Sequence, residues 1–159
     1  MKDRFLFPFT HGRSLEVGAR TVIVGILNIT PDSFYSGGRY WNNVEKAVER
    51  AGIMADEGAD VIDVGGESTR PGSHPISVEE ELRRTIPVVA AVREKLGDRI
   101  VISVDTYKSR VAGAALEAGA DMINSMGGAR FDDCILDVAA AHRCPLVVYH
   151  IKGTPETMQ

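Results

Sequence analysis

The chain has 159 residues, which is the size of one ordinary domain. Its net charge of −4, with acidic and basic residues interspersed, offers no basic stripe for nucleic acid or an anionic membrane surface. No apolar run approaches the ~20 residues of a membrane-spanning helix. We therefore expect one cytoplasmic domain over residues 1–159, with no nucleic-acid or membrane partner.

Strand and helix patterns alternate along the chain after a hairpin or irregular lead-in over residues 12–20. The apolar run Val22–Leu27 is too short for a membrane span and rich in β-branched residues, which predicts a strand buried on both faces. Turn residues bound the other short apolar runs in the same way. The expected strands are Val22–Ile29, Val61–Gly65, Ile100–Asp105, Met122–Ser125 and Pro145–His150.

Helices are expected between these strands, because apolar residues recur there at helical spacing. Asn42, with Glu45 three residues later, is expected to cap the first helix. Ser77 and Glu80 form a capping-box pattern at the start of the second helix, and Gly97 ends it. The four expected helices cover residues 44–55, 77–96, 109–118 and 133–143.

One sequence pattern occurs twice, each time at a helix-to-strand junction. The segment EGADVID over residues 57–63 recurs as AGADMIN over residues 118–124, which indicates a repeated βα unit. Successive β-α-β units with apolar strands imply a parallel sheet, and both a doubly wound sheet and a (βα)-barrel satisfy that pattern. Polar groups at every strand end favour the barrel of the TIM type.

The length is short for such a barrel. A complete eight-stranded barrel takes ~250 residues, so this chain accounts for about the first four and a half βα units. The first and fifth strands would then have unpaired edges. We expect another copy of the chain or a missing half to cover them.

Polar side chains gather where the strands are expected to end. Asn28 and Asp32 follow the first strand, and Arg70 lies in the glycine-rich loop after the second. Asp105 ends the third strand and Asn124 the fourth. Oxygen ligands of this kind suit Mg²⁺ bridging a diphosphate, an arginine fits an anion, and an amide fits a polar ring. An ordinary turn, a loop salt bridge at Arg70 and a helix cap at Asp105 are the structural alternatives.

Five segments resemble the dihydropteroate synthases, the folate-pathway enzymes targeted by sulfonamides, in their order and spacing. They are GILNITPDSF, IDVGGESTRPG, ISVDTYK, INSMGG and HIKGTPETMQ, from about residue 21 to residue 159. The resemblance implies a transferase built as a pterin-binding (βα)₈ barrel. Such an enzyme condenses 6-hydroxymethyl-7,8-dihydropterin diphosphate with 4-aminobenzoate, and releases 7,8-dihydropteroate and diphosphate. The cofactor that the resemblance implies is Mg²⁺.

The resemblance also implies roles for individual residues. Asn28 looks like the Mg²⁺ ligand, while Asp32 and Arg70 look like catalytic residues on the first and second loops. Mg²⁺ and Arg70 would stabilise charge on the departing diphosphate before the amine attacks the pterin methylene. The residues implied to contact the substrates are Ser33, Phe34, Thr69, Asp105 and Asn124.

Some positions depart from the family's pattern. Ser125 stands where the family more often has aspartate, and Tyr149-His150-Ile151 replaces a methionine-flanked histidine. The family's remaining pterin-reading aspartate, its pocket lysine and its Arg-x-His group have no counterpart up to Gln159. We therefore expect the isolated chain to be inactive or weakly active, and to form a homodimer or need a missing C-terminal half. His150 fits site lining and a structural histidine equally well.

Two other functions remain open at this point. The first is a methyltetrahydrofolate–corrinoid methyltransferase, another pterin-binding barrel, which needs no diphosphate site. The second is a non-catalytic half-barrel that self-associates through its unpaired strand edges. Mg²⁺-dependent ligand affinity separates the synthase from the methyltransferase, and a monodisperse monomer would speak against the self-associating half-barrel.

Overall fold

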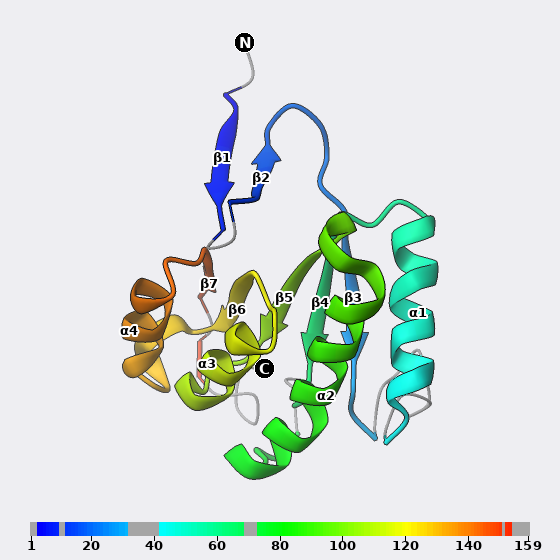
Figure 1. Cartoon of the computed structure of the whole chain (residues 1–159). Coiled ribbons are helices and arrows are strands. Elements are labelled where there is room, and N and C mark those ends of the chain that lie inside the picture. The colour runs from blue at the N-terminus through cyan, green and yellow to red at the C-terminus, as the bar shows by residue number, and fades with distance from the viewer. Residues whose placement is uncertain (1–2, 10–11, 32–41, 69–72, 151, 154–159) are drawn as a thin grey trace.

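The computed structural model describes residues 3–9, 12–31, 42–68, 73–150 and 152–153. Its main element is a parallel sheet of five strands, which lie side by side in chain order (Figure 1). Because the order never reverses, the sheet has the winding of a barrel rather than that of a doubly wound fold. The strands are β3 (Val24–Asn28), β4 (Val61–Gly65), β5 (Val101–Asp105), β6 (Met122–Met126) and β7 (Leu146–Tyr149).

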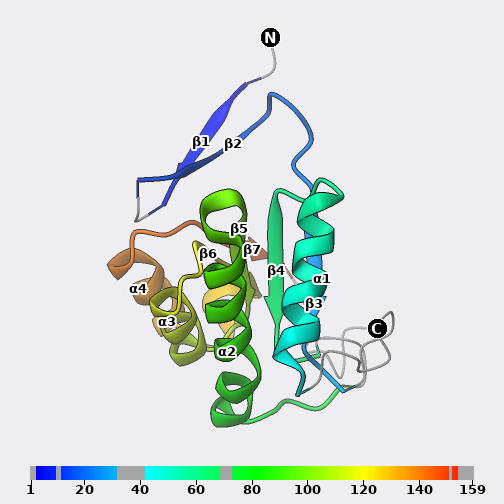
Figure 2. The ribbon, with the colours of Figure 1, turned by 45° about the vertical axis from the view of Figure 1, so that its right-hand side comes forward.

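Four α-helices in the described ranges cover a single face of this sheet (Figure 2). Side chains of that face, such as Ile62, Ile102 and Ile123, are fully buried against them. The helices are α1 (Val44–Asp56), α2 (Val78–Leu96), α3 (Ser109–Glu117) and α4 (Cys134–Ala141), with short 3₁₀ turns η1 (Gly97–Arg99) and η2 (Gly128–Arg130). The barrel-type α/β fold expected from the sequence is confirmed for the part that this chain spans.

Local capping explains where the helices begin and end. The Ser77 hydroxyl accepts the Glu80 amide N–H at 3.1 Å, and Gly97 ends α2 with a φ of 55°, as predicted. The prediction for α1 is wrong by one residue. Its cap is Asn43, which accepts the Lys46 N–H at 2.9 Å, while Asn42 adopts a left-handed φ of 53°.

Strand β3 differs from its prediction as a strand buried on both faces. Leu27 is fully buried under the helices, but Val24 is 50% exposed and Ile26 is 68% exposed on the opposite face. That opposite face carries no helix among the described residues, and β3 is the edge of the sheet. An unbroken apolar run indicates two buried faces only when both faces have neighbours.

An antiparallel hairpin, β1 (Phe5–Pro8) and β2 (Ser14–Val17), precedes the sheet. It starts earlier than the expected lead-in over residues 12–20. Figure 1 places it at the end of the sheet where the parallel strands begin. Phe9 and Leu15 pack there with Val61, Val101 and Met122, so the hairpin covers the amino end of the helix-free face.

The repeated sequence pattern has a physical cause in two aspartates. Asp60 accepts the Ile23 N–H at 2.9 Å, and Asp121 accepts the Ile102 N–H at 2.8 Å. Each carboxylate thus holds the backbone of the strand that precedes it in the sheet. Arginines neutralise them, with Arg20 on Asp60, and Arg13 and Arg93 on Asp121.

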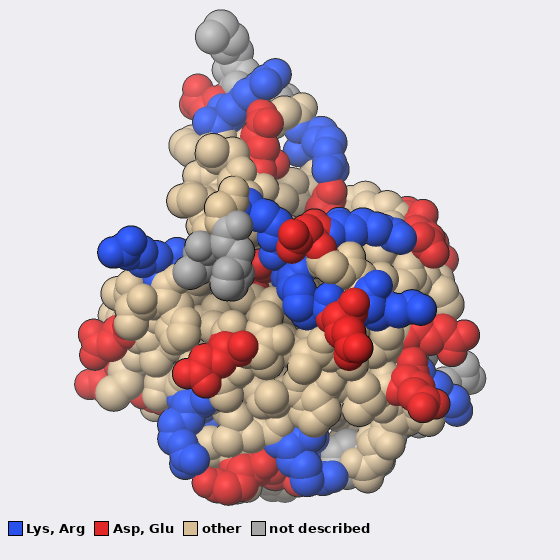
Figure 3. All heavy atoms as spheres, viewed as in Figure 1, with Lys and Arg blue, Asp and Glu red and all other residues tan. Residues whose placement is uncertain are grey.

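The surface of the helix-bearing face carries charges of both signs. Figure 3 shows lysine and arginine atoms intermingled with aspartate and glutamate atoms over this face. Such a mixture gives no field of one sign for steering a polyanion. In the part of the chain that the structure describes, no helix combines the length and apolar character that crossing a membrane requires.

Candidate functional site

The register of the sheet brings three predicted site residues into one row. Asn28 lies opposite Gly65, Gly65 opposite Asp105, and Asp105 opposite Asn124. Residues paired across parallel strands point to the same face, which here is the face without helices. The row therefore presents an amide, a carboxylate and a second amide side by side, with a glycine between the first two. Asn28, Gly65 and Asp105 end their strands, whereas Asn124, predicted to end the fourth strand, is the middle residue of β6.

Gly65 leaves room between Asn28 and Asp105. A Cβ atom at Gly65 would lie 3.1 Å from Asn28 Oδ1 and 3.8 Å from Asp105 Oδ2. Both side-chain oxygens therefore border the same small space above the Gly65 backbone. A side chain at this position would fill that space, so the glycine keeps it open.

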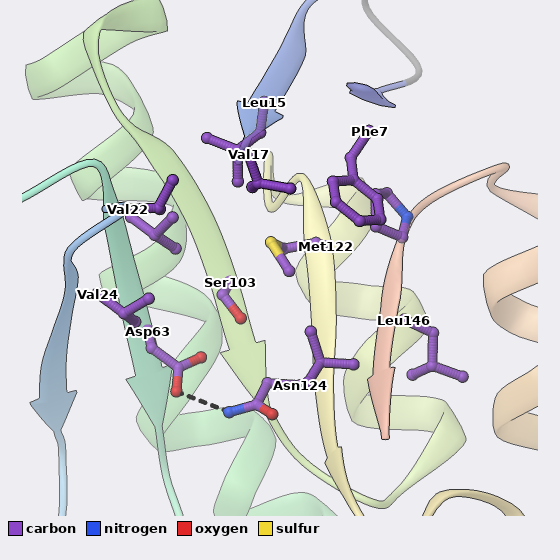
Figure 4. Close-up of a pocket in the computed structure, with 13 residues that line it drawn as sticks. Phe7, Leu15, Val17, Val22, Val24, Asp63, Ser103, Met122, Asn124 and Leu146 are labelled. Atoms are coloured by element: carbon purple, nitrogen blue, oxygen red, sulfur yellow. Dashed lines mark hydrogen bonds between the residues drawn. The ribbon is translucent and has the colours of Figure 1, made fainter. Parts of the chain in front are cut away.

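A second row lies on the same face, two residues nearer the amino ends of the strands. Here Ile26 lies opposite Asp63, Asp63 opposite Ser103, and Ser103 opposite Met122. Asp63 Oδ2 accepts the Asn124 amide at 2.9 Å, so it fixes which way that amide points (Figure 4). The sequence prediction omitted Asp63 from the site, although its period-two spacing from Gly65 is the signal that places it on this face.

The electrostatics of the two rows disfavour negative charge. Burial raises the pKa of Asp105 to about 7, with further increases from the carboxylates of Asp63, Glu81 and Glu67. Burial also raises the pKa of Asp63, although hydrogen bonds from Ser103 and Asn124 oppose the shift. Asp63 Oδ1 has no hydrogen-bond partner within the described ranges. A cation or a set of N–H donors would relieve this buried negative charge.

The donor set fits a small divalent cation at Asn28. Within the described residues, no hydrogen bond engages the Asn28 side chain, and its Oδ1 borders the same space as the Asp105 carboxylate. Mg²⁺ prefers a few protein oxygens of this type and completes its shell with water and substrate phosphates. The residues present are therefore chemically suited to the ion that the sequence predicts.

An apolar hollow of about 330 Å³ lies between the two rows and the hairpin. Figure 4 shows Phe7, Leu15 and Val17 of the hairpin above it, and the Asp63–Asn124 pair at the opposite end. The polar groups thus lie toward the carboxyl ends of the strands, and the apolar groups lie toward their amino ends. This layering is the arrangement of a TIM-barrel interior, where the chemistry is at the carboxyl face.

Five predicted site residues lie in segments outside the described residues. Residues 32–41 follow β3 and residues 69–72 follow β4. The predicted residues in these segments are Asp32, Ser33, Phe34, Thr69 and Arg70. His150 follows β7 as an exposed residue at the same edge of the sheet.

The strand order and the helix cover define a barrel-type α/β fold, with a row of polar side chains on its helix-free face. Comparison with known proteins is more specific. Residues 24–159 match the family described as pterin binding enzyme, and this chain belongs to that family.

Individual relatives agree with this family assignment. A dihydropteroate synthase from Synechocystis sp. is 48% identical over 160 residues, covering 100% of this chain and 54% of that protein. The Yersinia pestis dihydropteroate synthase, solved in complex with a sulfonamide drug, superposes with a TM-score of 0.88 at 39% identity over 98% of this chain and 54% of that one. The Burkholderia cenocepacia dihydropteroate synthase complexed with 7,8-dihydropteroate superposes with a TM-score of 0.76 at 39% identity, over 98% of this chain and 50% of that one. The chain therefore spans about half the length of the relatives it matches.

Proposed function

We propose that this chain supplies the pterin and diphosphate site of a dihydropteroate synthase. The observation that carries the proposal is the row of Asn28, Gly65, Asp105 and Asn124 across four neighbouring strands, on the face without helices. The likeness to dihydropteroate synthases along the whole chain supports it. The proposed substrates are 6-hydroxymethyl-7,8-dihydropterin diphosphate and 4-aminobenzoate.

The pterin ring suits two half-buried side chains of the row, Asp105 and Asn124. Asp105 offers two acceptor oxygens to ring N–H groups, and Asn124 offers one donor and one acceptor. The Asp63 carboxylate already uses the Asn124 amide N–H, so the Asn124 carbonyl is oriented for the ligand. Pterin N–H groups would stabilise the charged form of Asp105, which burial otherwise disfavours.

The diphosphate would leave from the neighbouring side of the row. Asn28 would hold Mg²⁺, which when bound neutralises charge on the departing diphosphate. Arg70 would pair with the same anion, and Asp32, Ser33, Phe34 and Thr69 would complete the substrate contacts. In the reaction the pterin methylene loses its C–O bond to diphosphate and gains a C–N bond to the aminobenzoate nitrogen, which releases a proton. No covalent intermediate with the chain is needed.

The exposed, helix-free face of the sheet bears on the domain's surroundings and partners. Residues 1–159 act as one pterin-binding domain in the cytoplasm, and the exposed Ile26 and Val24 on β3 need a cover. We propose that a complementary half-barrel or a second copy supplies it. The mixed surface charge agrees with small-molecule substrates rather than nucleic acid or membrane as partners.

A chimera tests this function. This chain is joined to the part of the Synechocystis dihydropteroate synthase that it does not cover, and the product is tested for growth of cells lacking their own synthase. We expect growth without added folate products, and 7,8-dihydropteroate formation in vitro that depends on both substrates and Mg²⁺. The matched control is the same chimera with Asn28→Ala, for which we expect a roughly 100-fold slower reaction.

The chimera has a clear contradicting result. A folded chimera that binds methyltetrahydrofolate without Mg²⁺ and forms no dihydropteroate would favour the methyltransferase instead. Circular dichroism establishes that the chimera is folded before the assay is interpreted.

A further inference from the structure

One side-chain hydrogen bond joins the two rows of the sheet across an intervening strand. Asp63 on β4 accepts the Asn124 amide N–H of β6 at 2.9 Å, although β5 lies between these two strands. Ser103 is the β5 residue opposite Asp63, and its small side chain leaves room for the contact (Figure 4). The contact therefore depends on a small residue at position 103.

The stability of the fold does not explain why a carboxylate is buried at position 63. Asp63 is 6% exposed, and its Oδ1 has no hydrogen-bond partner within the described ranges. A buried carboxylate with an unpaired oxygen costs free energy. An apolar side chain of similar size would suit the adjoining hollow, whose lining is mostly apolar. The carboxylate therefore needs another explanation.

The neighbouring strands hold the backbone of Asn124, so the remaining freedom is the orientation of its side-chain amide. The Asn124 backbone carbonyl accepts the Thr106 N–H at 3.0 Å. The residue is paired with Asp105 on β5 and with Val147 on β7. A carboxylate has only acceptor oxygens, so the bond to Asp63 requires the amide nitrogen on that side. Figure 4 shows this nitrogen toward Asp63 and the amide oxygen pointing away from it.

We propose that Asp63 is a positioning residue that makes the site select a 2-amino-4-oxo ring over a 2,4-dioxo ring. The two rings carry opposite groups at two neighbouring positions. Pterin has an acceptor at N1 and a donor in its 2-amino group, whereas the dioxo ring has an N1–H donor and a 2-carbonyl acceptor.

Asp63 exerts this selection through Asn124. An amide held in one orientation matches one order of donor and acceptor and opposes the other, whereas an amide that can turn over serves both. This inference rests on the proposed function, and deepens it by assigning the choice of ring to a residue outside the predicted site.

The test compares 6-hydroxymethyl-7,8-dihydropterin with its 2-oxo counterpart. Calorimetry at pH 8 measures both affinities for the whole chain. We expect the native chain to prefer the 2-amino ligand by about tenfold or more. Asp63→Asn keeps the shape of the side chain but can donate as well as accept, so we expect the preference to fall to within about threefold. A merely structural role would weaken both ligands equally and leave their ratio unchanged.

A double-mutant comparison tests whether the effect passes through Asn124. Asp63→Asn is added to an Asn124→Ala chain, in which no side-chain amide remains to be oriented. We expect it to change the ratio of the two affinities by less than about twofold there. A change as large as in the native background would mean that the Asp63 charge acts directly on the ligand, and would overturn the positioning role.

Two substitutions at Ser103 complete the design. Ser103→Ala is the matched control, because it alters the surroundings of Asp63 but leaves room for the bond to Asn124, so the preference should persist. Ser103→Val places a larger side chain between the two, and serves if Asp63→Asn does not fold. The adjoining hollow, which Ser103 lines, has space for the added methyl groups. We expect this variant to reduce the preference to within about threefold.

The outcomes separate this inference from the proposed function. A native chain that binds the two ligands equally, or an Asp63→Asn chain that keeps the native preference, would overturn the role of Asp63 alone. A native chain that binds neither ligand would overturn the proposed site and the role of Asp63 together.

Discussion

Replacing Asp105 with asparagine is expected to weaken pterin binding about 100-fold and yet to stabilise the fold at pH 8. The amide keeps the shape of the side chain but replaces one acceptor oxygen with a donor that faces the ring N–H groups. The stabilisation arises because burial raises the pKa of Asp105 to about 7 from its ordinary 3.8, so the charged form is unfavourable in the folded chain.

The direction of the pH effect follows from these two pKa values. Between about pH 4 and pH 7 the folded chain keeps the Asp105 proton while the unfolded chain has lost it. The free energy of unfolding therefore falls as the pH rises through this window, and the fall ends above pH 7. The asparagine variant lacks this fall, so it gains roughly 2 to 4 kcal/mol relative to the native chain at pH 8.

Urea unfolding at pH 5 and pH 8 measures the effect, with calorimetry of pterin binding on the same samples. Asp137→Asn is the control, because it removes an exposed carboxylate on α4. It should leave the change in unfolding free energy between pH 5 and pH 8 the same as in the native chain. A D105N chain whose stability follows the native one at both pH values would show that Asp105 is not a strained buried carboxylate.

The second large effect is expected at Asp121, at the opposite end of the sheet. Its side chain is 1% exposed and accepts the Ile102 N–H at 2.8 Å and the Arg93 guanidinium at 2.5 Å, besides pairing with Arg13. Asp121→Ala would leave two arginines and a buried backbone N–H without this partner. We expect a loss of about 3 to 5 kcal/mol of unfolding free energy.

Asp60→Ala provides the matched comparison, since Asp60 has the equivalent position in the repeated unit. It is 15% exposed, and its partner Arg20 is 65% exposed. Solvent screens this pair, so we expect a loss of about 1 kcal/mol. Chemical denaturation of both variants at pH 7 gives the comparison. Equal losses at the two aspartates would contradict the importance of burial for the Asp121 cluster.

Much of the fold could be predicted because local patterns decide it. The strand Val61–Gly65 agrees residue for residue with the structure, and the Ser77 cap and the Gly97 stop are where their residue types indicate. The first helix cap was misplaced because Asn42 and Asn43 are chemically alike. Backbone conformation and a hydrogen bond from Arg83 to Asn42 decide between them.

Other features depend on residues that are far apart in the sequence. The choice between a barrel and a doubly wound sheet needs the strand order, which periodicity does not contain. The exposure of Ile26 depends on what lies across the sheet from it. Lys108 forms ion pairs with Glu81 and Glu67, which are 27 and 41 positions away in the sequence, so no local motif predicts these contacts. The row of Asn28, Asp105 and Asn124 was predictable because parallel strands end at one edge.

The most direct test of the proposed site is a calorimetric titration of the purified chain with 6-hydroxymethyl-7,8-dihydropterin diphosphate, with and without Mg²⁺. We expect binding that requires Mg²⁺ and that loses this requirement, together with most of its affinity, in an Asn28→Ala chain. Absence of binding under both conditions, or binding that is indifferent to Mg²⁺ and to Asn28, would contradict the claim that these strand ends form a metal and diphosphate site.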